Sequence, residues 1–234
     1  MKIKLADHVF AVENHDTYVE QLCRDYQTVD SVEKTIRVTE DEIRAENMDG
    51  GNWPFPYLES LAVYRKITEY LLADDILLFH CSALSIDGKA YLFTAPSGTG
   101  KSTHARLWRE YFGNRVTMIN DDKPLLAVRQ DGITVYGTPY GGKDNIQTNT
   151  SEKVAGIVIL HQADRNEMHR MTAKEAYPML LNQTYRCSDA EGMVKTMDLV
   201  QKLSGLPVYS LGCTISREAV ELAWNTLNKA GGDG

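Results

Sequence analysis

Apolar residues follow two different spacings along this chain, and the changes between them mark its elements. Over residues 57–73 they recur at helical spacing, which predicts an amphipathic helix. The next two runs, ILLFHCSALSI and AYLFT, flank the turn residues Asp87 and Gly88 and predict a β-hairpin. Asp131 and Gly132 predict a second hairpin between DDKPLLAV and GITVYG.

The other apolar runs alternate between strand length and helix length. Strands are predicted at RVTMIN, EKVAGIVILHQ and PVYSLG, with an edge strand at EMHRMT. Helices are predicted over 101–113, 173–181, 190–203 and 216–228. Strands and helices that alternate around a hairpin-rich centre predict an α/β fold, with a mixed β-sheet flanked by helices.

The first fifty residues have a weaker pattern. KIKL, HVFAV and EKTIRVT are short strand candidates, and TEDEIRAEN is either a polar connection or a short helix. The glycines and prolines of GGNWPFP close this section. We therefore predict a small β-rich extension over 1–50, a main domain over 51–230 and a flexible tail over 231–234.

Composition narrows the classes of function. Apolar residues make up 43% of the 234, enough for a buried core, and the net charge of −7 argues against binding to bulk nucleic acid or an anionic membrane. No apolar run approaches the about 18 residues of a membrane helix, and the charged start has no signal-peptide core. Four scattered cysteines indicate reduced thiols rather than a zinc site, so we expect a cytoplasmic protein.

The segment APSGTGKS lies between a predicted strand and a predicted helix, which is the setting of a phosphate-binding P-loop (Walker A motif). Gly98 and Gly100 let backbone N–H groups wrap a phosphate, Lys101 reaches the β- and γ-phosphates, and the Ser102 hydroxyl joins a Mg²⁺ shell. Ala95 replaces the first glycine of the pattern, which a negative φ tolerates. The alternative is an ordinary glycine-rich turn. The expected nucleotide contacts are Ser97, Gly98, Thr99, Gly100, Lys101, Ser102 and Thr103.

Asp121 and Asp122 end the strand that follows the P-loop helix. Adjacent carboxylates on a strand point to opposite sides, so one could hold Mg²⁺ while the other faces a substrate hydroxyl as general base. The alternative is a solvated Asp-Asp turn.

LLFHCSALSIDGKAYLFTAPSGTGKST followed by INDDKPLL resembles the catalytic domain of HPr kinase/phosphorylase. The similarity is closer to the HPr-kinase-related proteins often found beside peptide-modification genes, and it extends from Tyr57 to the C-terminal helix. The resemblance implies a P-loop kinase fold of the HPr kinase and phosphoenolpyruvate carboxykinase type, with ATP and Mg²⁺. It also implies that Asp121 is the catalytic base, that His80 pairs with it, and that Asp122 is a metal ligand. Taken alone, His80 could be a half-buried strand histidine.

The chain departs from HPr kinase in two places. Thr103 and His104 follow Ser102 where HPr kinase has an acidic residue, and the later Glu-Arg-Arg-Gly-Leu-Gly signature is replaced by a loop over 137–143. HPr as acceptor and the reverse phosphorylase activity are therefore in doubt. Lys143 on this loop and Arg186 are candidate substrate contacts, or else a solvated lysine and a surface ion-pair partner.

These observations predict an ATP-dependent, Mg²⁺-requiring serine kinase that transfers the γ-phosphate to a hydroxyl. The acceptor would be a serine or threonine of a peptide or protein, or a free amino acid. The alternative is an ATP-binding regulatory or assembly module without phosphoryl transfer. A phosphoenolpyruvate carboxykinase activity ranks last, because those enzymes are much longer and need further substrate and metal residues that have no counterpart in this sequence. The expected partners are a nucleotide and the acceptor, without nucleic acid or membrane, and a homo-oligomer stays open.

Overall fold

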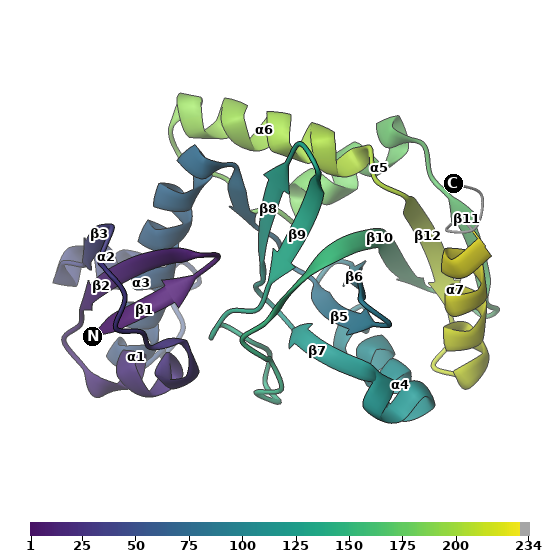
Figure 1. Cartoon of the computed structure of the whole chain (residues 1–234), viewed down its shortest axis with the longest axis horizontal. Coiled ribbons are helices and arrows are strands. Elements are labelled where there is room, and N and C mark those ends of the chain that lie inside the picture. The colour runs from purple at the N-terminus through teal and green to yellow at the C-terminus, as the bar shows by residue number, and fades with distance from the viewer. Residues whose placement is uncertain (230–234) are drawn as a thin grey trace. The chain divides into compact units, whose positions relative to one another are not determined.

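The computed structural model describes residues 1–229 (Figure 1). These residues form two compact units, one over Met1–Ile76 and one that begins at Leu77. The tail predicted over 231–234 lies outside the described residues. None of the helices in residues 1–229 contains a hydrophobic stretch that could span a lipid bilayer.

The first unit is built on a three-stranded sheet in the order β1-β2-β3. β1 and β2 are antiparallel, and β3 runs parallel to β2. The strands are β1 (Lys2–Leu5), β2 (His8–Glu13) and β3 (Lys34–Arg37). The helices are α1 (Thr17–Leu22), η1 (Arg24–Tyr26), α2 (Glu40–Ala45), α3 (Phe55–Leu71) and η2 (Leu72–Asp74). The three predicted strands are thus confirmed.

Two short helices of this unit depend on their caps. TEDEIRAEN forms α2, because Thr39 accepts a hydrogen bond from the Glu42 backbone while the Glu42 side chain accepts one from the Thr39 backbone. The Asp16 side chain caps α1 by accepting from the Tyr18 backbone. Helix α1 was not predicted, because its six residues are too few to show a helical period.

The long helix α3 packs against α1, α2 and β3 inside the first unit. Its inner face and the sheet share fully buried apolar side chains, among them Ile3, Phe10 and Ile67. The compact unit consequently extends to Ile76, whereas the predicted domain boundary lies at residue 50. A compact unit is not in itself a folding domain, and the division into domains stays a prediction.

The second unit is built on a nine-stranded sheet. Its main path runs β4-β8-β9-β10-β6-β5-β7, and β12 lies beside β10 with β11 outside it. The strands are β4 (Ile76–Leu78), β5 (Ser82–Ile86), β6 (Lys89–Thr94), β7 (Val116–Asn120), β8 (Leu125–Arg129), β9 (Gly132–Tyr136), β10 (Ser151–Gln162), β11 (Glu167–Arg170) and β12 (Val208–Cys213). Both predicted Asp-Gly hairpins are confirmed, as β5–β6 and β8–β9.

The central strand β10 makes this sheet mixed, because it runs parallel to β6 and β12 but antiparallel to β9. The helices are α4 (Lys101–Phe112), η3 (Gly113–Arg115), α5 (Ala173–Asn182), α6 (Ala190–Ser204) and α7 (Arg217–Lys229). α4 packs on β5, β6 and β7 and also contacts α7, and Trp108 is fully buried between these layers (Figure 1). A mixed sheet flanked by helices was predicted and is confirmed.

The run ILLFHCSALSI is not the single strand that was predicted. It forms β4, which lies beside β8, and then β5, which pairs with β6 and β7. Between them the His80 backbone N–H donates to the Gln183 carbonyl at 2.7 Å, and the Cys81 N–H donates to the Asp122 carbonyl at 3.2 Å. These bonds to other segments interrupt the strand and place His80 beside the Asp pair.

Candidate active site

The predicted phosphate loop joins β6 to α4. Gly98 has a φ of +79° and Gly100 a φ of +120°. Apart from the adjacent residues, no atom of the part of the chain that the structure describes lies within 4 Å of a Cβ built on either glycine. The backbone conformation, not space, therefore requires glycine. Ala95 is buried and has no positive φ, which explains why alanine is tolerated at the first position.

The N-terminus of α4 is open to an anion. Its N-cap residue, Gly100, has no side chain to satisfy the first backbone N–H groups. Ser97 and Gly98 are exposed on the loop, and Ser102 is exposed in the first turn of the helix beside the half-buried Thr103. Backbone donors and the positive end of the helix therefore point at the same exposed surface.

Lys101 links this loop to the Asp pair. Its side chain is buried, with 8% exposure, and its Nζ donates to the Ala95 carbonyl at 3.1 Å. Burial lowers the pKa of Lys101, while Asp122, Cys81 and Asp121 act in the opposite direction. Cys81 is itself fully buried, and burial raises the pKa of its thiol well above the ordinary value. The loop cation and both carboxylates thus belong to one electrostatic cluster.

Asn120 shapes the turn that carries the two carboxylates. Its side-chain amide donates to the Thr138 carbonyl at 3.0 Å, and its Oδ1 accepts from the backbone N–H groups of Asp122 and Lys123. A buried side chain therefore holds the backbone of the Asp pair from inside. Asn120 was not among the predicted site residues, although asparagine before a turn is a known signal.

Asp121 is buried, with 5% exposure, and accepts a hydrogen bond from the Ser82 hydroxyl at 2.6 Å. The glycine-rich loop over 137–143 approaches its other oxygen. A Cβ added to Gly142 would lie 2.8 Å from Asp121 Oδ2. The Gly142 backbone therefore packs directly on this carboxylate.

Asp122 points to a different set of groups. Its Oδ1 lies 3.2 Å from His80 Nε2, and its Oδ2 forms an ion pair with Lys123. Burial alone would raise the pKa of Asp122, but His80 and Lys123 outweigh it and hold the pKa below its ordinary value. The expectation that His80 pairs with Asp121 is corrected here. Neighbouring side chains face opposite ways, and Ser82 occupies the Asp121 side.

His80 is held from three directions. Its Nδ1 lies 3.1 Å from Gln183 Oε1, its backbone N–H donates to the Gln183 carbonyl, and its carbonyl accepts from the Thr94 hydroxyl at 2.8 Å. Both ring nitrogens face oxygen atoms. Ser82 and Gln183 were not among the predicted site residues. Ser82 lies two positions after His80, a strand-period signal, whereas nothing local marks Gln183.

The two candidate substrate contacts lie on segments that reach the site. Lys143 directly follows Gly142 and is exposed. Arg186 is also exposed and follows Tyr185, whose N–H donates to the Leu78 carbonyl at 3.0 Å. Their roles as substrate contacts stay predictions.

No protein-family model matches the chain, and no curated protein matches it. The HPr(Ser) kinase/phosphatase from Coxiella burnetii is a similar solved structure, with 15% sequence identity and a TM-score of 0.37. The match covers 66% of this chain and 99% of that one. A similarity of this size shows neither the kinase type of the fold nor the chemistry of the site.

Proposed function

We propose that this protein is an ATP-dependent kinase that transfers the γ-phosphate to a hydroxyl group. The observation that carries the proposal is the position of Lys101. It begins the helix after a glycine loop of left-handed backbone, and it interacts electrostatically with both Asp121 and Asp122. A phosphate cradle and a carboxylate pair in one cluster are the parts that phosphoryl transfer to a hydroxyl requires.

The loop suits a polyphosphate. The N–H groups of the loop and of the first turn of α4 supply hydrogen-bond donors, and the first turn of α4 contains no acidic side chain that would repel a phosphate. Among residues 1–229, the buried Lys101 ammonium donates to one acceptor, the Ala95 carbonyl, so it retains N–H groups for phosphate oxygens. The phosphates would also offset the burial that lowers its pKa.

Asp121 is the better candidate for general base. Its hydrogen-bond donor is the neutral Ser82 hydroxyl, and its second oxygen faces the glycine-rich loop. The acceptor oxygen attacks the γ-phosphorus and loses its proton to Asp121. The new P–O bond forms as the bond to the β–γ bridging oxygen breaks, and ADP leaves with that electron pair.

Asp122 suits a metal ligand. The hydrogen bond from His80 and the charge of Lys123 keep the pKa of Asp122 low, so Asp122 stays ionised and is a weak base. Mg²⁺ takes one or two carboxylates together with phosphate oxygens and water, so Asp122 and the exposed Ser102 hydroxyl fit it without a larger cluster. When bound, the ion would neutralise charge on the phosphates. His80 becomes a positioning residue for Asp122.

The acceptor class follows from the chemistry of the base. A carboxylate that accepts a proton suits an alcohol, so serine or threonine is the expected acceptor, free or within a peptide or protein. Lys143 and Arg186 remain the candidates for holding it.

The test incubates the purified chain with ATP and Mg²⁺ against serine, threonine and a panel of serine-containing peptides, with phosphorus NMR as readout. Asp121→Asn should abolish transfer while ATP affinity, from calorimetry, stays within about threefold. Asp122→Asn should raise the Mg²⁺ concentration that is needed for half-maximal transfer. Asp164→Asn, an exposed carboxylate on the β10–β11 connection, is the matched control and should change neither quantity.

Two results would contradict the proposal. One is ATP binding without transfer to any acceptor, which would favour a regulatory or assembly module. The other is transfer that survives Asp121→Asn, which would remove the base assigned here.

A further inference from the structure

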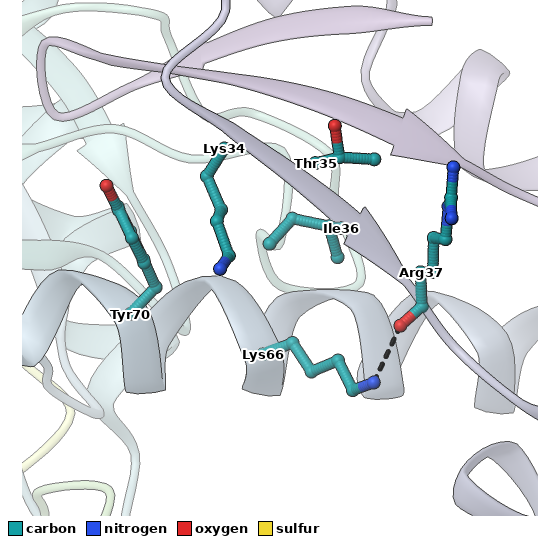
Figure 2. Close-up of a pocket in the computed structure, with 6 residues that line it drawn as sticks. All are labelled: Lys34, Thr35, Ile36, Arg37, Lys66 and Tyr70. Carbon is teal, nitrogen blue, oxygen red and sulfur yellow. Dashed lines mark hydrogen bonds between the residues drawn. The ribbon is translucent and has the colours of Figure 1, made fainter.

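The first unit contains a groove that the proposed kinase chemistry does not use. It has a volume of about 530 Å³ and lies between the edge strand β3 and helix α3 (Figure 2). Its lining residues come from these two elements and are Lys34, Thr35, Ile36, Arg37, Lys66 and Tyr70.

One edge of β3 is open. In the part of the chain that the structure describes, β3 pairs with β2 and with no other strand. In a paired strand, alternate residues direct their N–H and C=O groups away from the partner. On this outer edge the Arg37 carbonyl accepts a hydrogen bond from Lys66 Nζ at 2.6 Å (Figure 2). A lysine thus occupies the place that the backbone N–H of an added strand would take, and Thr35 presents its backbone in the same direction.

The charge of the groove favours an acidic occupant. Its six lining residues include three cations and no carboxylate. Arg37 is already paired with Glu13, and Lys66 with Glu42. Lys34 is exposed, and its Nζ lies 5.7 Å from the centre of the Tyr70 ring. Figure 2 shows the Lys34 side chain extending from β3 toward α3, with the Tyr70 ring beside it.

We propose that this groove binds an extended peptide with acidic side chains, which adds a strand to the outer edge of β3. Main-chain hydrogen bonds to the edge provide affinity, and a carboxylate meets Lys34. The four residues of β3 span roughly 13 Å, so about four peptide residues would be paired. The inference is independent of the proposed kinase activity.

The first test uses a fluorescein-labelled octapeptide of alternating glutamate and threonine, with lysine replacing glutamate in the control peptide. Fluorescence anisotropy with the full chain should show binding of the acidic peptide, at least about tenfold tighter than the control. Amide chemical shifts should move at Thr35 and Arg37, and not on β1. Equal binding of both peptides, or shifts confined to β1 or to the second unit, would overturn the proposal.

Strand addition has a period of two, which a second test exploits. One peptide carries N-methyl groups on its glutamate amides and another on its threonine amides. Because the carboxylates must face Lys34, only one of the two sets of peptide amides can point at β3. Methylation of that set should lower the affinity about tenfold, whereas methylation of the other set should keep it within about threefold. Equal affinities for the two peptides would exclude backbone pairing.

A charge variant tests the protein side. Lys34→Glu should weaken acidic-peptide binding about fivefold, and Lys174→Glu, on an exposed residue of α5, should not change it. Equal effects of the two variants would refute recognition by Lys34. A second copy of the chain is the other possible occupant of the groove, and sedimentation of the free chain tests for it. Dimers whose formation shifts the same β3 amides would show that a second copy fills the groove, which would contradict the proposal.

Discussion

Replacing Lys101 by methionine should remove nucleotide binding and leave the fold at least as stable as before. The wild-type lysine is 8% exposed, and its Nζ donates to the Ala95 carbonyl. Burial lowers its pKa in spite of the opposing effect of Asp122, Cys81 and Asp121. The cost of burying this cation therefore exceeds the stabilisation that the neighbouring carboxylates supply.

The size of the effect follows from this balance. Apolar replacement of a buried ionic group is often neutral or stabilising by about 1–4 kcal/mol, and the lost hydrogen bond costs about 1 kcal/mol. A net gain of about 1 kcal/mol corresponds to a Tm about 2–4 °C higher for a chain of this length. The pH dependence has a definite sign. The folded pKa lies below the ordinary 10.5, so the unfolded state binds more protons between the two values, and wild-type stability rises with pH there.

Thermal unfolding with and without ATP and Mg²⁺ measures both the change in stability and the loss of nucleotide binding. ATP should raise the Tm of the wild type and leave that of Lys101→Met unchanged. Lys143→Met, on an exposed loop lysine, should leave the intrinsic Tm unchanged and serves as the control. A Tm for Lys101→Met more than about 3 °C below wild type, or a preserved response to ATP, would refute the reasoning.

Three further predictions concern the carboxylates. Ser82→Ala removes the 2.6 Å donor to Asp121 and should cost about 1.5–3 kcal/mol of unfolding free energy in urea, whereas an unchanged value would exclude a stabilising bond. Gly142→Ala places a Cβ 2.8 Å from Asp121 Oδ2, so kcat should fall at least about tenfold with ATP affinity kept. His80→Asn should raise the pKa of Asp122, moving the acidic limb of the pH–rate profile to higher pH. It should also reduce the stability that this carboxylate supplies above pH 3.8 and loses as pH falls through its lowered pKa.

The elements that the sequence predicts well have local signals. The Asp-Gly turns of both hairpins and the glycine loop before α4 need only a few neighbouring residues to define their backbone. The environment of His104 was not predicted. His104 is buried, accepts a hydrogen bond from Trp108 Nε1 at 3.0 Å, and has its pKa lowered by burial to about 4.

The parts that the sequence does not reveal depend on distant residues. The break between β4 and β5 requires Gln183, which is 103 positions from His80 along the chain. No periodicity within ILLFHCSALSI contains that information. The partner of His80 was likewise assigned to the wrong aspartate, because the choice depends on where Ser82 lies after β5 has paired with β7.

The thiol of Cys81 provides a way to measure how often the candidate site opens. It lies between His80 and Ser82, is fully buried, and has a pKa well above its ordinary value because of burial. Alkylating reagents react with exposed thiolates, so modification of Cys81 must await a local opening fluctuation. Cys213 is only partly buried and supplies a faster-reacting internal reference. The ratio of the two labelling rates, followed by mass spectrometry, would therefore compare how often the segment around Cys81 opens with how often the end of β12 opens, without any substitution.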